Sequence, residues 1–284
     1  MRKILLGLIL VLMTITFVSA AEDGQAIRFA DEYESQVSAQ ELAKDYEGWK
    51  ISLAIRAGRA EYEEKEQTIK SKYNVIYPEA VLTVNNTTSG GMDIGADFAF
   101  GYSLTDTETW YVSGAEYQTN DLNLYRGDFK GRLGKVIGGE GFSITPFVGY
   151  GFRYINFDRS NFNILNTITL RDVVTEKYYI QHGDAGVKFS KKFGEKFSLY
   201  GKGTYGHVFY DKAHNSVLGS IDGKGGYIAE GDLNLGFALS DSCDLSLGGF
   251  AEFQKLKGGE KSGVIWPNNT LEIYGGQVGV LYKF

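Results

Sequence analysis

The sequence predicts an all-β protein, a closed antiparallel transmembrane β-barrel built as an up-and-down meander of ten strands, with eight or twelve as the alternatives. Two observations carry this prediction. The chain ends on a strand that alternates between two faces, and segments of the same period recur through its interior. Lipid cannot hydrogen-bond an open sheet edge, so strands of this kind must close on themselves to cross a membrane.

The N-terminus has the pattern of a signal peptide. Met1-Arg-Lys supplies a positive start, Ile4 to Val18 is an uncharged apolar stretch, and Val18-Ser-Ala20 fits cleavage after a small residue. We therefore expect residues 1–20 to be removed. The single Cys243 excludes a disulfide within the chain and a cysteine metal cluster, and a formal net charge of -6 argues against nucleic-acid binding.

Residues 21–48 differ in composition from the rest of the chain. They are polar and acidic, and Ser38-Ala-Gln-Glu41 matches a capping box at the start of a helix. We expect a periplasmic N-terminal segment, either a tail or a short helix, with a plug folded into the barrel mouth as the alternative. The barrel is then predicted to span residues 49–284.

Ten segments carry the two-residue period. Met92, Ile94 and Ala96, for example, interleave with Asp93, Gly95 and Asp97. One face of each segment suits lipid and the other suits a lumen. The predicted strands are 49–63, 91–104, 108–118, 121–135, 142–156, 178–190, 196–210, 227–239, 244–255 and 272–284.

The connections between these segments fall into two kinds. Short ones are predicted at 105–107, 136–141, 191–195 and 240–243, and long ones at 64–90, 157–177, 211–226 and 255–271, with a tight turn at 119–120 as the exception. Short periplasmic turns opposite long outer loops are typical of transmembrane barrels, which places both termini in the periplasm. The first long loop contains 73–84, which could itself pair as a strand.

The last strand resembles the C-terminal signal that bacterial outer-membrane barrels present to the barrel assembly machinery. Counting back in twos from the final residue gives one aromatic and apolar face, while Gln277 and Lys283 lie on the other. The residues assigned to this assembly signal are Tyr274, Val278, Val280, Tyr282 and Phe284.

A second resemblance lies in the fifth predicted strand. Thr145-Pro-Phe-Val-Gly-Tyr-Gly-Phe-Arg-Tyr154 is similar to a strand of the opacity-type and outer-membrane-protein-A-like barrel superfamily, and the likeness extends over residues 49–284. The resemblance implies a monomer in the outer membrane of a Gram-negative bacterium, in contact with lipid and lipopolysaccharide. It also implies a structural or adhesin-like role, with a surface ligand bound through the outer loops.

The predicted inner faces carry seven basic and seven acidic residues. Charges inside a narrow barrel are costly unless paired, so we expect salt-bridge ladders that leave the barrel closed. A narrow porin-like channel for ions or small solutes is the alternative function. The predicted lumen charge network consists of Arg56, Asp93, Asp97, Arg126, Asp128, Lys130, Arg132, Arg153, Asp184, Lys188, Lys202, Glu230, Asp232 and Glu252.

A rim hydrolase is the second alternative. His182, His207 and His214 fall in the outer half of the predicted barrel with Asp184 and Asp211 nearby, and a carboxylate–imidazole pair can activate water. The surrounding residues match neither the omptin protease nor the lipid A deacylase motifs. We therefore expect no enzyme, with no catalytic residue, cofactor or metal.

The outer loops are the predicted place for recognition. Among their polar residues they carry apolar ones, Ile164, Leu165 and the run Val264-Ile-Trp-Pro267. That run fits a strand extension or an interfacial anchor above the bilayer, or else an adhesive patch.

Overall fold

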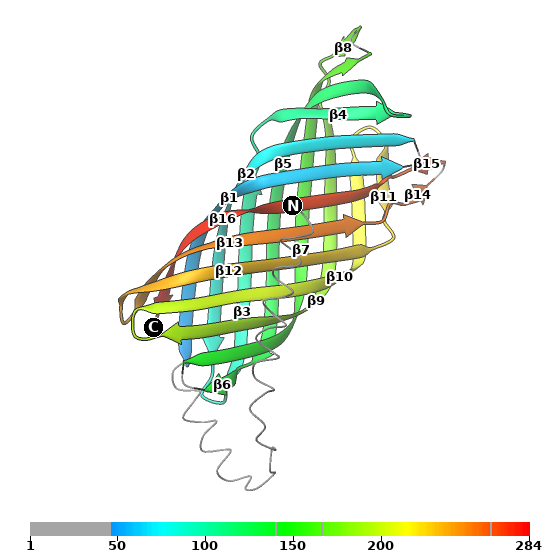
Figure 1. The fold of residues 1–284 in the computed structure, drawn as a ribbon. Helices are drawn as coiled ribbons and strands as arrows, with labels where there is room; N and C mark the ends of the chain where they lie inside the picture. Colours follow the sequence, from blue (N-terminus) through cyan, green and yellow to red (C-terminus); the bar gives the residue numbers. More distant parts are fainter. Residues whose placement is uncertain (1–46, 67, 140, 166, 262) are drawn as a thin grey trace. The chain divides into compact units, whose positions relative to one another are not determined.

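A β-barrel is formed by residues 47–284, which the computed structural model describes except for residues 67, 140, 166 and 262 (Figure 1). The predicted signal peptide 1–20 and residues 21–46 of the predicted N-terminal segment lie outside the described residues. No helix within the described part of the chain is long and apolar enough to cross a membrane.

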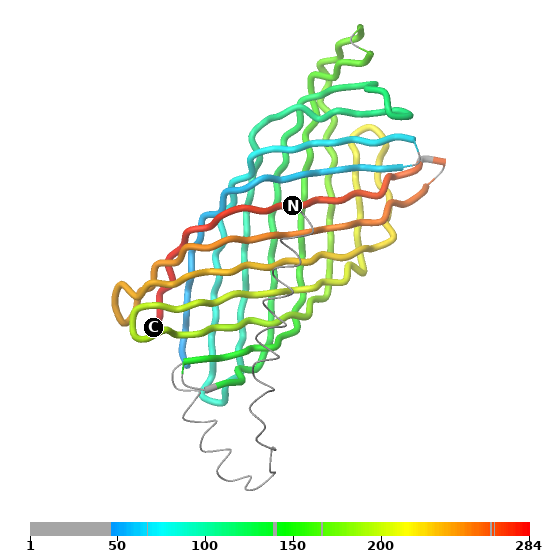
Figure 2. Tube along the Cα trace, viewed as in Figure 1, coloured from blue at the N-terminus to red at the C-terminus, as the bar shows by residue number. Residues whose placement is uncertain are grey.

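Ten antiparallel strand positions make the barrel wall. In chain order they are β1 (Gly48–Glu66), β2 (Ile69–Thr87), β3 (Met92–Tyr102) continued by β4 (Asp106–Val112), β5 (Ala115–Lys135), β7 (Phe142–Ile164), β9 (Val174–Phe193), β10 (Phe197–Asn215), β12 (Gly226–Ser240), β13 (Cys243–Leu256) and β16 (Asn268–Lys283). β16 pairs with β1 and closes the ring, and Figure 2 shows this last strand (red) beside the first (blue). The predicted closed meander is confirmed.

Five shorter strands lie in the connections. They are β6 (Ile137–Gly139) and β8 (Ile168–Leu170), which pair with β7, β11 (Gly219–Asp222), which pairs with β10, and the small hairpin of β14 (Glu260–Lys261) and β15 (Val264–Ile265). The chain reverses at 88–91, 136–141, 194–196 and 241–242 at the end that holds Gly48 and Phe284. We call this end periplasmic and the opposite end outer, because short turns face the periplasm in such barrels.

The strands at the start of the barrel differ from those predicted. The predicted loop 64–90 contains a complete strand, β2, joined to β1 by a tight turn. The predicted strands 91–104 and 108–118 share one position, since β3 and β4 both pair with β2 on one side and β5 on the other. The turn predicted at 119–120 lies inside β5, and the real turn is Ser113–Gly114. One missed strand and one divided strand leave the total at ten.

The predicted long outer loops are also mostly strand. β7 runs to Ile164, β10 runs to Asn215, and β16 begins at Asn268. The reason lies in the solvent. In the membrane the apolar residues of a strand face outward, as Val148 does, whereas beyond the membrane they face inward, as Phe157 does. The strand continues, but its polarity reverses, and the sequence pattern then resembles an irregular polar loop.

A proline explains why β3 and β4 are separate. Pro78 lies in β2 opposite Ala57 of β1, and the pairing of β2 with β3 ends at Glu79. Proline has no N–H to donate to a neighbouring strand, so the ladder is interrupted there. The chain between β3 and β4 bridges the gap, where the Leu104 N–H donates to the Ile76 carbonyl at 3.3 Å.

The outer wall carries an apolar belt. On the terminal strand, Val278, Val280 and Tyr282 are each 44–48% exposed, a fraction that suits lipid rather than water. A girdle of aromatic rings marks the outer edge of this belt, with centroids of neighbouring rings 4.9 to 5.9 Å apart. Its members are Tyr102, Tyr125, Tyr154, Tyr179, Tyr205, Tyr227 and Phe253.

Beyond the girdle the strands extend past the membrane. Their outward residues become polar, as with Asn123 and Asp121 of β5, while their inward residues form a buried apolar core. Members of this core include Tyr62, Leu122, Leu124, Ile155, Phe157, Tyr178, Ile180, Trp266 and Leu271. The outer half of the barrel is therefore filled with side chains.

Candidate functional site

The structure places all fourteen predicted lumen charges on inward faces or in buried contacts, but they do not form one network. Six of them form a central ionic layer across the barrel: Arg126, Asp128, Lys130, Arg153, Glu230 and Glu252. Asp93, Asp97, Arg132, Lys188 and Lys202 form a second set nearer the periplasm. Arg56 pairs with Glu79, Asp184 pairs with His182, and Asp232 accepts a hydrogen bond from Asn234.

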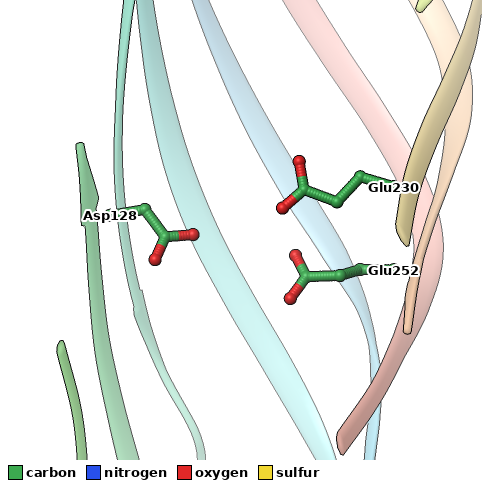
Figure 3. Close-up of side chains that lie close together, drawn as sticks. All are labelled: Asp128, Glu230 and Glu252. Atoms are coloured by element: carbon green, nitrogen blue, oxygen red, sulfur yellow. The ribbon is translucent and has the colours of Figure 1, made fainter. Parts of the chain in front are cut away.

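The central ionic layer joins opposite walls. Arg153 of β7 donates to Asp128 of β5 at 2.7 and 2.9 Å, and reaches across the lumen to Glu252 at 2.6 Å and Glu230 at 2.9 Å. Arg126 also binds Glu252, at 2.6 Å. Figure 3 shows Asp128 facing Glu230 and Glu252 from the other side of the barrel.

The three carboxylates of this layer lie close enough to hold a metal ion, with ligand oxygens within 4.8 Å of one another. Three cations already neutralise them, because Arg126, Arg153 and Lys130 each contact at least one of the three. A divalent cation would have to displace buried guanidinium groups that are themselves well satisfied. The central ionic layer is therefore a set of ion pairs that links opposite walls of the barrel.

A cavity of about 530 Å³ lies on the periplasmic side of the central ionic layer. Polar side chains line it, including Thr83, Asn85 and Asn234, together with the second set of charges. It extends to the turns at 194–196 and 241–242, so it opens toward the periplasmic end. Its other limit includes Arg126, Asp128, Glu230 and Glu252 of the central layer.

A second buried ionic group, the outer cluster, lies in the part of the barrel beyond the membrane. It consists of Arg159 and three glutamates, Glu64, Glu108 and Glu176, contributed by β7, β1, β4 and β9. Arg159 donates to these three carboxylates at 3.0, 2.6 and 2.8 Å. Every side chain of the cluster is at most 6% exposed.

The glutamates of the outer cluster differ in acidity. Burial, followed by the repulsion of the Glu176 carboxylate, raises the pKa of Glu64 to about 8. Burial also opposes ionisation of Glu108, but the Arg159 guanidinium and its hydrogen bonds hold the pKa of Glu108 below its ordinary value. At neutral pH Glu64 is therefore mostly protonated, in a cluster that has more carboxylates than cations.

Aromatic rings surround the outer cluster. The Arg159 guanidinium lies 5.5 Å from the Phe157 ring and 5.7 Å from the Trp110 ring. Tyr178 donates to Glu176 at 2.5 Å and accepts from the Trp266 indole at 2.9 Å. These rings exclude water from the carboxylates. The cluster therefore links four strands and helps to close the interior of the barrel.

Sequence reasoning missed the outer cluster because it placed Glu64, Arg159 and Glu176 in loops and did not assign Glu108, the first residue of the predicted strand 108–118, to the inner face. A signal was present, since each charged member stands two residues from an aromatic that shares its face. The pairs are Tyr62 and Glu64, Glu108 and Trp110, Phe157 and Arg159, and Glu176 and Tyr178.

The three histidines lie on different surfaces. His182 is buried in the lumen, 2.6 Å from Asp184. His207 lies on the outer wall beside Tyr227, and His214 is exposed, with Ser220 at 2.9 Å. Asp211 accepts from the Gly225 N–H at 2.8 Å and so holds the loop before β12. The described residues bring no histidine to the inner rim of the outer end.

No protein-family model matches this chain, and no curated protein matches it in sequence. Among solved structures, it is similar to the outer membrane protease OmpT from Escherichia coli, with a TM-score of 0.64 and 11% identity over 83% of this chain and 96% of that one. The translocator domain of the autotransporter NalP from Neisseria meningitidis aligns with a TM-score of 0.41 and 13% identity, over 88% and 96%. The attachment invasion locus protein Ail of Yersinia pestis aligns with 0.31 and 14%, over 84% and 99%.

The likeness to OmpT is one of fold. The closed ten-stranded barrel, its apolar belt and its aromatic girdle are those of a Gram-negative outer-membrane protein.

Proposed function

We propose that this protein is a closed outer-membrane barrel that acts by surface interaction at its outer end. The observation that carries the proposal is the filled outer half. The apolar core and the outer cluster occupy the interior beyond the girdle, and the described polar cavity lies on the periplasmic side of the central ionic layer. A solute entering from the periplasm therefore meets two buried layers.

The outer hairpins support a recognition role. Leu165, Ile168, Leu170 and Val173 are 42–62% exposed at the β7–β8–β9 connection, far from the lipid belt. Leu165 also has a φ of 52°, a left-handed conformation that a leucine adopts at a cost of roughly 1–2 kcal/mol. A strained and solvated leucine makes no contribution to the core, which favours a role in contact with another surface.

We propose a non-enzymatic role for the same reasons of geometry. The carboxylates gathered at the outer end are buried under aromatic rings, where water and substrate have no access. The imidazoles that would complete a rim hydrolase lie in the lumen, on the outer wall and at the exposed outer end of β10.

The closed state is tested by osmotic swelling of liposomes that contain the refolded protein. Heat-modifiable gel mobility checks that the barrel is folded. We expect no swelling above that of empty liposomes in arabinose, because the filled outer half leaves no path for a sugar. Swelling that scales with the amount of folded protein would support the narrow-channel alternative instead.

The surface role is tested on intact cells that display the protein. We expect serine replacements at Leu165, Ile168, Leu170 and Val173 to reduce autoaggregation and adhesion to hydrocarbon, with the folded level unchanged. The matched control replaces polar residues of the same connection, Asn163, Thr167 and Asp172, by alanine. Equal adhesion in both variants would show that these four apolar residues do not mediate the surface interaction.

A further inference from the structure

Two outer hairpins of the barrel form a groove on the water-exposed face. The outer end of β2 pairs with β4 from Ile69–Val112 to Lys72–Thr109, and the Ser113 N–H donates to the Thr68 carbonyl at 2.8 Å. The turn 113–114 is thereby fixed against the turn of the neighbouring hairpin. The groove between them has a volume of about 530 Å³.

The charged side chains lining this groove are all basic. Lys65, Lys70 and Lys72 line it, and no acidic residue does. Lys70 is paired with Glu63 at 2.8 Å, outside the lining. Lys65 and Lys72 are exposed and make no ion pair within the described part of the chain.

The strand register makes this basic row costly without a counter-ion. Lys65 stands directly opposite Lys70, and Lys70 stands opposite Tyr111, so the two ammonium groups are neighbours on one face. Like charges in directly opposed positions of a sheet destabilise the pairing. Glu63 pairs with Lys70 and stands directly opposite Lys72, whereas the residue opposite Lys65 on β2 is Lys70. An anion held in the groove would relieve the repulsion between Lys65 and Lys70.

The uncharged lining indicates what carries that anion. Tyr111 supplies a flat ring with a polar tip, and Thr68 and Ser113 supply hydroxyls beside the lysines. Gly114 and Ser113 adopt positive φ angles of 85° and 50°, which fix the turn sharply rather than leave it open. An aromatic face, hydroxyls and point charges together suit a sugar ring that bears oxyanions.

We propose that this groove binds a saccharide carrying phosphate or sulfate groups. The inference rests on the proposed surface role and specifies a ligand class and a site for it. Two sources supply this chemistry, the phosphorylated core of lipopolysaccharide in the same membrane and a sulfated glycan of another surface.

The test measures binding of two probes to the refolded protein in detergent micelles, a heparin oligosaccharide and a detergent-solubilised lipopolysaccharide with an intact phosphorylated core. The variant is Lys65→Gln with Lys72→Gln. The matched control is Lys255→Gln with Lys257→Gln, which removes the same charge from exposed lysines at the outer end of β13 and just beyond it.

We expect the Lys65 and Lys72 variant to bind at least one probe more than about tenfold more weakly than wild type, because charge-assisted contacts are lost, while the control binds within about twofold of wild type. The affected probe identifies the source. Equal weakening in both variants, or binding of neither probe by wild type, would contradict the proposal that the groove binds such a saccharide. The proposed function would still stand without this site if the liposomes remain impermeable and the apolar residues of the β7–β8–β9 connection still mediate adhesion.

Discussion

At the scale of single residues, the outer cluster shows how a barrel keeps charge in a dry interior. One guanidinium satisfies three carboxylates, and four aromatic side chains complete their hydrogen bonds or cover them. A proton on Glu64 removes one of the two excess negative charges of the cluster. Replacing Arg159 would leave buried carboxylates without a counter-charge, a change that costs about 3–5 kcal/mol in comparable buried pairs.

This protonation predicts a pH dependence. The pKa of Glu64 is raised from 4.5 to about 8, so its contribution to the free energy of unfolding is fully present below pH 4.5 and is lost as the pH rises through about 8. We expect wild type to lose stability between about pH 5 and about pH 9, by an amount on the order of a few kcal/mol, and Glu64→Gln to lose less. Urea unfolding of both proteins at these pH values measures the difference.

Glu108 provides the contrast for this experiment. Its pKa lies below the ordinary value, so it is ionised at neutral pH, and Glu108→Gln removes a real ion pair with Arg159. We expect Glu108→Gln to destabilise the protein at pH 7 more than Glu64→Gln does. Equal effects of the two substitutions would contradict the assigned protonation states.

At this scale the sequence predicts which residues point into the barrel and which point outward. It does not predict which inward charges form ion pairs with one another. Fourteen lumen charges could be assigned from the period of two, because side chains of a strand alternate strictly. Which carboxylate meets which guanidinium depends on the stagger between distant strands. Arg153 meets Glu252, 99 positions along the chain, and nothing local to either residue encodes that contact.

At the scale of strands, membrane depth decides what the sequence reveals. The terminal strand could be recognised because the outward row of its last eleven residues faces lipid, whereas β2 was missed because it changes from one environment to the other near its middle. Ile76 faces outward and is exposed, but Tyr73 and Val75 face the core. A pattern of one phase becomes the opposite phase within a single strand, and a search for continuous alternation fails there.

The hairpin between β4 and β5 predicts a difference between two glycines. Gly114 has a φ of 85° and Gly127 has no such angle, while an added methyl group meets nothing within 4 Å at either position. Gly114→Ala should therefore lower the free energy of unfolding by roughly 1 kcal/mol through backbone strain alone. Gly127→Ala is the control, and a loss of stability as large as that of Gly114→Ala would contradict this explanation.

The last strand predicts an assembly defect. Phe284 packs against Tyr282 with ring centroids 4.7 Å apart, and its N–H donates to the Trp49 carbonyl at 3.0 Å at the point of closure. We expect deletion of Phe284 to reduce the amount of folded protein in the outer membrane severalfold, because the exposed aromatic end of the row is lost. Fractionation with heat-modifiable mobility measures this level, and a wild-type level would count against the assembly signal.

At the scale of the whole molecule, the barrel is divided along its axis into regions of different character. A polar cavity opens toward the periplasm, a central ionic layer braces opposite walls, and an apolar core with the outer cluster fills the part beyond the membrane. The sequence predicted charges paired inside a narrow barrel. It did not predict the apolar outer core. Some of its residues, such as Phe157, Trp266 and Leu271, were assigned to loops, and others, such as Leu122, Leu124 and Ile155, lie at the outer ends of predicted strands, where the inward row changes from charged to apolar.

Single-channel recording of the folded wild-type protein in a planar bilayer tests the central claim most directly. We predict no conductance steps, and none after Arg126 and Arg153 are both replaced by glutamine, because the apolar core closes the outer half independently of the central ionic layer. Discrete, reproducible steps from wild type would contradict the closed barrel and make the lumen charges the lining of a channel.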